Sequence, residues 1–163
     1  MDMDRQSHLI KAIRDAMHET AMAFFATDLE IREGPAISRG ERSSKHSAQT
    51  DVTAIVDFRG AMHGGIQLSA PLHAALGLAS AFWGEPLEDF NDTARDALGE
   101  LTNILAGAMK SRINDGLDLT PPRVLQGEAQ DHFDNDLLDS TRCYFLTTNG
   151  PLFIELYYNP LDA

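Results

Sequence analysis

The stretch "DALGELTNILAG", residues 96 to 107, places two carboxylates, a carboxamide and a glycine at helical spacing. At about 100° per residue, the four side chains fall within a stripe about 60° wide. They are Asp96, Glu100, Asn103 and Gly107. Apolar residues occupy the opposite arc: Ala97, Leu98, Leu101, Ile104, Leu105, Ala108 and Met109. Because that arc should pack on the rest of the protein, we predict that the stripe faces water.

The residue types in the stripe limit its chemistry. It holds no histidine and no cysteine, and Asn103 can neither accept nor release a proton at neutral pH. A glycine inside a helix costs about 1 kcal/mol relative to alanine, so Gly107 on the exposed face suggests that another surface comes close. Spacing alone favours a solvated helix face with an incidental glycine, and the residue identities must decide between the two interpretations.

The composition excludes several classes of function. Of the 163 residues, 43% are hydrophobic and 23% are charged, which is typical of a globular chain. The net charge of -12 argues against binding to nucleic acid and to anionic membranes. The single cysteine, Cys143, excludes an internal disulfide and a cysteine-based zinc site. With no signal-like apolar segment at the N-terminus and no run long enough to cross a bilayer, we expect a cytoplasmic protein.

Periodicity and turn residues predict the elements that must position the stripe. We expect helices at 7–26, with Ser7 as N-cap, at 70–84 and at 91–114, with the stripe on the third. Strands are predicted at 51–58 and 61–69, at 122–127, and at 141–148 and 152–158 around an Asn149-Gly150 turn. Residues 32–50 read mostly as loop, with one short strand near Ile37. Short connections favour a largely antiparallel sheet covered by helices, within a single domain at 1–163.

The stripe resembles the signature of the CheC/CheX/FliY-type phosphatases of bacterial chemotaxis, CheX most closely: Asp or Ser, three residues, Glu, two residues, Asn, and commonly a Gly four residues later. Three further segments look like strands of that family: "GAMHGGIQLSAP" at 60–71, "PRVLQG" at 122–127 and the closing "GPLFIELYY". CheC-type members carry a second copy of the signature in the first helix. Here Asp15 and Glu19 have the right spacing, but Met22 stands where the amide would be, so we expect one active helix.

The resemblance implies an α+β, CheC-like fold and a phosphatase that hydrolyses the phosphoaspartate of a CheY-like receiver domain. In that case Asn103 would orient the attacking water, and Glu100 would accept a hydrogen bond from the receiver's lysine. Asp96 and Gly107 would serve docking. The chain would need no cofactor or metal of its own, because Mg²⁺ is bound by the partner receiver. A homodimer formed through the sheet is compatible with the resemblance. The alternative is a non-catalytic adaptor that binds a receiver or a motor-switch component; a ligand-sensing domain is a weaker third reading.

Other residues that could do chemistry lack the required pattern. The acidic stretch "DHFDNDLLD", 131–139, fails the calcium-loop pattern at Phe133 and lacks its glycine and terminal glutamate, so we read it as a solvated loop. The six histidines show no paired metal spacing on one predicted face. Cys143, in an alternating strand, is typical of a small core residue.

Overall fold

The structure is a computed structural model that describes residues 3–25, 30–38, 51–114, 116–127 and 139–159. The described residues form three helices: α1 (Met3–Phe24), α2 (Leu72–Trp83) and α3 (Asp92–Ile113). They also form seven strands: β1 (Ile31–Ser38), β2 (Val52–Gly60), β3 (Gly64–Ala70), β4 (Leu117–Leu119), β5 (Arg123–Gln126), β6 (Asp139–Thr147) and β7 (Gly150–Tyr158).

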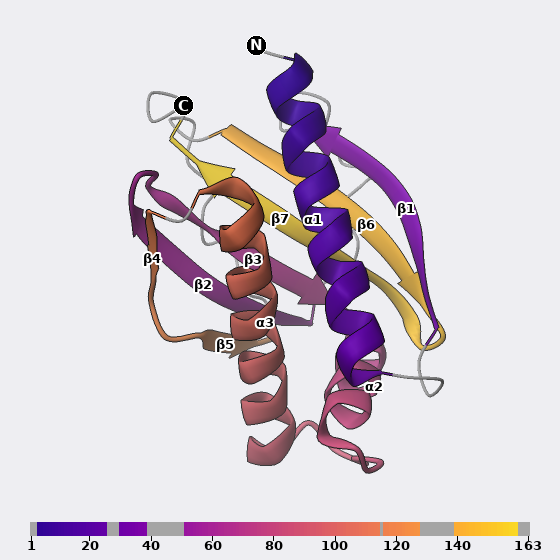
Figure 1. Cartoon of the computed structure of the whole chain (residues 1–163). Coiled ribbons are helices and arrows are strands. Elements are labelled where there is room, and N and C mark those ends of the chain that lie inside the picture. The colour runs from indigo at the N-terminus through magenta and orange to yellow at the C-terminus, as the bar shows by residue number, and fades with distance from the viewer. Residues whose placement is uncertain (1–2, 26–29, 39–50, 115, 128–138, 160–163) are drawn as a thin grey trace.

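The strands form one antiparallel sheet in the order β1-β6-β7-β3-β2-β4, with β5 also pairing with β2. The hairpins β2–β3 and β6–β7 supply four neighbouring strands of this sheet, and β3 pairs with β7 to join them. Figure 1 shows α1 and α3 lying across one face of the sheet, with α2 at one end. This is the α+β arrangement predicted from the sequence.

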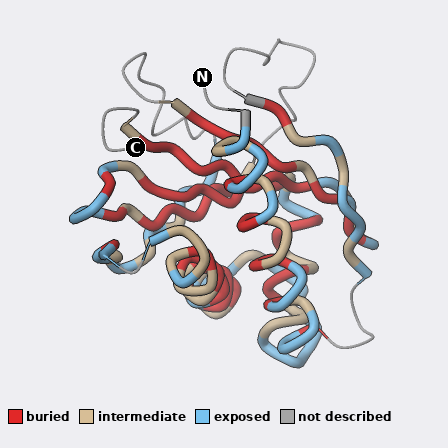
Figure 2. Tube along the Cα trace, turned by 45° about the horizontal axis from the view of Figure 1, so that its top comes forward, coloured by how far each residue is buried: buried red, intermediate tan, exposed pale blue. Residues whose placement is uncertain are grey.

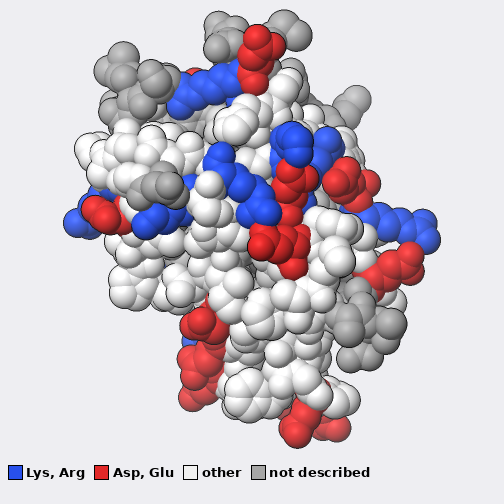
Figure 3. Space-filling view, viewed as in Figure 1, with Lys and Arg blue, Asp and Glu red and all other residues white. Residues whose placement is uncertain are grey.

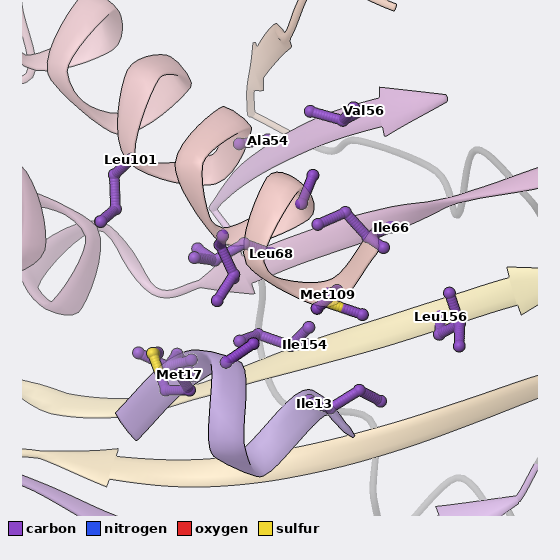
Figure 4. Packing of buried hydrophobic residues seen from close by; sticks show 14 of the residues in the cluster. Ile13, Met17, Ala54, Val56, Ile66, Leu68, Leu101, Met109, Ile154 and Leu156 are labelled. Atoms are coloured by element: carbon purple, nitrogen blue, oxygen red, sulfur yellow. The ribbon is translucent and has the colours of Figure 1, made fainter. Parts of the chain in front are cut away.

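The core lies between the sheet and the inner faces of α1 and α3, where buried residues concentrate (Figure 2). Figure 4 shows Ile13 and Met17 of α1 on the same cluster as Leu101 and Met109 of α3. The sheet contributes apolar side chains to that cluster, including Ala54, Val56, Ile66, Leu68, Ile154 and Leu156. Each such leucine or isoleucine stabilises the fold by about 1.5–3 kcal/mol on burial, so the core fixes which face of α3 points outward.

Two local predictions need correction. Helix α1 begins at Met3, so Ser7 lies inside the helix and is not its cap. The early turns are held by tertiary contacts, with the Arg5 guanidinium 4.9 Å from the Tyr158 ring centroid and Leu9 buried. The short strand predicted near Ile37 is present, but it begins already at Ile31, in a segment predicted as loop; it is β1, an edge strand whose register shifts between Glu33 and Ala36. Edge strands and bulges tolerate the Gly and Pro residues that made this segment read as loop.

The remaining differences are small. Strand β4 was not predicted, because its three residues are too few to show a period and it exists only by pairing with the end of β2. The β6–β7 turn consists of Thr148 and Asn149, with Thr147 paired to Gly150, one position before the predicted Asn149-Gly150. Most of the acidic segment and residues 39–50 lie outside the described residues.

Candidate active site on helix α3

Helix α3 has defined ends that fix where its stripe of polar residues starts. The Asn91 side chain accepts a hydrogen bond from the Ala94 N–H at 2.9 Å, which caps the N-terminus. Asp92 lies in the first turn, while Lys110 and Arg112 lie in the last. These charges complement the helix dipole, so the helix is stabilised at both ends by its own sequence.

The stripe faces outward as its periodicity predicted. Asp96 and Glu100 are exposed, and Asn103 and Gly107 are half-buried. Most of the apolar arc is buried: Ala97, Leu98, Leu101, Leu105 and Met109, with Ile104 and Ala108 partly buried. Burial of one arc against the sheet therefore presents the other arc to solvent.

The polar side chains of the stripe are not engaged in hydrogen bonds or ion pairs with the described residues. Among the residues that the structure describes, the side chains of Asp96, Glu100 and Asn103 have no hydrogen-bond or ion-pair partner. A Cβ placed on Gly107 would meet no atom within 4 Å, so internal packing does not demand a glycine there. Two carboxylates and an amide are thus available to a second molecule, beside an unobstructed turn of helix.

A groove runs beside the N-terminal half of the stripe, between α3 and the segment that leads into β5. It has a volume of about 360 Å³ and is lined by Arg95, Asp96, Gly99, Glu100, Pro122 and Val124. The two sides approach closely at Gly99, where an added Cβ would be in van der Waals contact with Val124 Cγ2 at 3.5 Å and Pro122 Cγ at 3.6 Å. Figure 1 shows β5 beside the middle of α3. The groove places an apolar wall opposite Glu100.

The related pattern on α1 is in a different electrostatic state. Lys11 forms an ion pair with Asp15 and holds the pKa of that carboxyl below its ordinary value. Glu19 is bound by Arg112 of α3, whose guanidinium also donates to the Ala108 carbonyl. Met22, at the amide position, is 72% exposed. Both carboxylates of α1 are therefore already paired, and a methionine side chain stands at the position where α3 has its amide.

The distribution of charged side chains on the surface agrees with this difference between α3 and α1. Acidic side chains gather over the lower part of α3 in the view of Figure 3. Where the upper end of α3 meets α1, basic and acidic side chains adjoin one another. The free carboxylates of the stripe belong to the N-terminal half of α3.

The sequence did not indicate a role for two arginines that link helices to strands, Arg95 and Arg14. Arg95 and Arg14 each directly precede the aspartate of the pattern, so that "RDA" occurs at 14–16 and again at 95–97. Arg95 donates to the Val124 carbonyl of β5 at 2.7 Å, and Arg14 donates to the Gly34 carbonyl of β1 at 2.8 Å. The repeated tripeptide was the available signal, but it is too short to indicate a tether without the tertiary structure.

The rest of the described chain offers weaker sites. No group of three or more His, Cys, Asp or Glu residues in the described ranges is arranged to hold a metal ion. A hollow of about 480 Å³ lies between α2, the α2–α3 connection and Asn149, away from the stripe. Cys143 is fully buried, and burial raises the pKa of its thiol to about 12, as suits the core residue we predicted. Nor is any helix of the described residues long and apolar enough to cross a membrane.

The family model described as "Chemotaxis phosphatase CheX" matches residues 52–145, more than half of the chain, including all of α3. The chain belongs to the CheX family. A search of curated proteins finds no significant match. Membership agrees with the resemblance on which the sequence-based fold prediction depended.

Solved structures share the fold of this CheX-family chain at low sequence identity. A chemotaxis protein CheX from Desulfovibrio desulfuricans has a TM-score of 0.77 at 19% identity, over 93% of this chain and 99% of that one. A CheX–CheY–BeF₃–Mg²⁺ complex from Borrelia burgdorferi matches with a TM-score of 0.73 at 22% identity, over 92% and 97%. FliY from Thermotoga maritima matches with a TM-score of 0.70 at 14% identity, over 98% and 92%. At these identities the likeness establishes the CheC-like fold.

Proposed function

We propose that the chain is a phosphatase that accelerates hydrolysis of the phosphoaspartate of a CheY-like receiver domain, with α3 as its active helix. The observation that carries the proposal is the carboxamide of Asn103, which lies on the outward stripe of α3 with no partner among the described residues. Membership of a family of chemotaxis phosphatases and the CheX–CheY complex among its structural matches support the choice of substrate.

Asn103 orients the water that attacks phosphorus. Its amide offers one acceptor and two donors, which can fix a water molecule without any proton transfer to the side chain. The water oxygen forms a bond to phosphorus as the bond from phosphorus to the aspartyl oxygen breaks, giving inorganic phosphate and a free carboxylate. Because an acyl phosphate is already activated, positioning and electrostatics supply most of the catalysis in such a reaction. The receiver brings the Mg²⁺ that balances the phosphoryl charge.

Glu100 docks the receiver. Its exposed carboxylate is one turn of helix from Asn103 and accepts a charge-assisted hydrogen bond from the receiver's lysine. Asp96 adds negative charge one turn further toward the N-terminus, and the open surface at Gly107 lets the receiver approach closely. Since the chain carries a net charge of -12, long-range attraction toward an acidic receiver is absent, and affinity depends on these local contacts.

The second candidate is a non-catalytic adaptor that uses the same stripe. The unpartnered carboxylate of Glu100 keeps this candidate open, because docking a partner through it does not require hydrolysis. An adaptor and a phosphatase both bind a receiver through Glu100, but only the phosphatase depends on Asn103. The adaptor's partner would be a receiver or a motor-switch component, and for either function we propose the cytoplasmic location expected from the sequence.

The test is phosphate release from a CheY-type receiver domain phosphorylated with acetyl phosphate, with and without the chain. The Asn103→Ala variant is expected to lower the accelerated rate by about 100-fold or more, the scale of removing one preorganised polar group from a reacting centre. Binding of the same variant to the receiver loaded with BeF₃⁻ and Mg²⁺ should stay within twofold of wild type.

The matched control is Met22→Ala, which truncates the residue at the corresponding position of α1 and should leave the rate unchanged. Wild-type binding without faster phosphate loss would establish the adaptor instead. Equal rates for wild type and Asn103→Ala would refute the water-orienting role.

A further inference from the structure

Arg95 and Arg14 form equivalent tethers between a helix and a strand. Arg95 donates from Nη1 to the Val124 carbonyl at 2.7 Å and from Nη2 to Gln126 Oε1 at 3.3 Å. Arg14 donates from Nη2 to the Gly34 carbonyl at 2.8 Å, with its Nε 3.8 Å from Glu33 Oε2. Each arginine directly precedes the aspartate of the pattern on its helix. Arg95 reaches β5 and Arg14 reaches β1, and neither strand is central in the sheet. The chain therefore contains the same device twice, once beside an active pattern and once beside an inactive one.

The Arg95 tether fixes one side of the groove against the other. Its side chain leaves α3, lines the groove and ends on β5, while Pro122 and Val124 form the opposite wall. The polar acceptors are a carbonyl and a carboxamide, so the tether holds position without neutralising Asp96 or Glu100. Losing it would leave β5 held by its backbone pairing with β2 but without a hydrogen-bonded link to the N-terminal half of α3.

We propose that Arg95 is a positioning residue for partner docking: by tethering α3 to β5 it sets the width of the groove beside Glu100. This inference rests on the proposed function, because the groove is taken as part of the receiver's docking surface. A surface that is already ordered before binding loses less entropy when the partner arrives. Arg95 touches neither the reacting phosphoryl group nor the water, and acts through the placement of Glu100 relative to Pro122 and Val124.

The geometry distinguishes an effect on docking from an effect on chemistry. Arg95 and Glu100 line the same groove, whereas Asn103 is absent from its lining and lies about 12 Å along the helix from Arg95. Removing the tether should therefore weaken association and leave the turnover of bound receiver unchanged. A purely structural role would act through the folded fraction: misfolded protein lowers kcat per mole of chain and leaves KM unchanged. A tenfold rise in Kd through reversible unfolding would need about 90% of the variant to be unfolded, which circular dichroism would reveal.

The experiment compares Arg95→Ala with Arg14→Ala, which loses a tether of the same kind on the inactive helix. The dissociation constant is measured for a CheY-type receiver loaded with BeF₃⁻ and Mg²⁺, and kcat and KM for the phosphorylated receiver. Arg95→Ala is expected to raise both Kd and KM about tenfold with kcat within twofold of wild type. Arg14→Ala should leave all three within twofold. Arg95→Lys, which keeps one donor and a positive charge, should be intermediate and provides a measurement if Arg95→Ala folds poorly.

A double-mutant cycle with Glu100→Ala tests whether Arg95 acts through Glu100. If it does, Arg95→Ala should weaken binding by no more than twofold further on the Glu100→Ala background. Equal losses for the Arg95 and Arg14 variants, or full additivity in the cycle, would overturn the inference. Failure of the proposed function looks different: Asn103→Ala would keep its activity, while the Kd comparison would still decide the role of Arg95. A wild-type chain that binds no receiver would overturn both.

Discussion

Helices α1 and α3 carry the same series of arginine, aspartate and glutamate, and both lie on one face of the sheet (Figure 1). On α3 the two carboxylates are free among the described residues and an amide follows them. On α1 Lys11 and Arg112 pair with the carboxylates, and Met22 takes the place of the amide. The comparison teaches that the spacing of a motif does not make a site; the side chains must also be left unpaired by their neighbours.

The ion pair between Glu19 and Arg112 also links the two helices. It connects α1 to the C-terminal turn of α3, so a carboxylate that could have docked a partner instead joins the two helices. Both side chains are partly exposed, Arg112 at 31% and Glu19 at 60% of the side chain, and such a pair contributes only about 0.2–1 kcal/mol. The pair therefore makes the Glu19 carboxylate unavailable to a partner, although it adds little to the free energy of unfolding.

Exchanging the amide between the helices should give the largest effect. In the double variant Asn103→Met with Met22→Asn, the amide stands on α1 beside carboxylates that are already paired. Phosphate release should fall by about 100-fold or more, as for loss of the amide alone. The measurement is receiver dephosphorylation, with Met22→Asn alone as the control. A double variant as active as wild type would mean that pairing of the carboxylates does not explain why α3 is active and α1 is not.

The next effect concerns the two glutamates. Glu100→Gln should weaken binding to the BeF₃⁻-loaded receiver about tenfold, since a charge-assisted hydrogen bond contributes on the order of 1.5–3 kcal/mol. Glu19→Gln should leave that affinity unchanged and lower the free energy of unfolding by no more than about 1 kcal/mol. Titration calorimetry and urea unfolding measure the two quantities. Similar losses of affinity for both variants would place part of the docking surface on α1.

The smallest effect, with opposite signs for stability and binding, is expected at Gly107. Because a Cβ there would extend into open space, Gly107→Ala should raise the free energy of unfolding by about 0.5–1 kcal/mol through better helix propensity. The same methyl would stand between α3 and a close-packed receiver, so affinity should fall severalfold. Met22→Ala, the exposed control on α1, should not change affinity. Unchanged binding by Gly107→Ala would remove Gly107 from the docking surface.

Much of the fold followed from local patterns. The 3.6-residue period predicted α3 at 91–114, against an observed Asp92–Ile113, and alternation predicted the hairpin of β2 and β3. Strands β1 and β4 did not follow in the same way, because one is an irregular edge strand with Pro35 and the other has only three residues. Such strands are defined by the neighbour they pair with, and pairing is not a local property.

The same division applies to the candidate site. The sequence by itself determined which residues share the stripe of α3, because the rise and twist of a helix fix that geometry for any context. Only the tertiary structure decided which carboxylates remain unpaired among the described residues and so available to a second protein. Arg112 reaches Glu19 across 93 residues of sequence, and Arg95 reaches Val124 across 29. Partners so distant along the chain are chosen by the packing of α1 and α3 on the sheet.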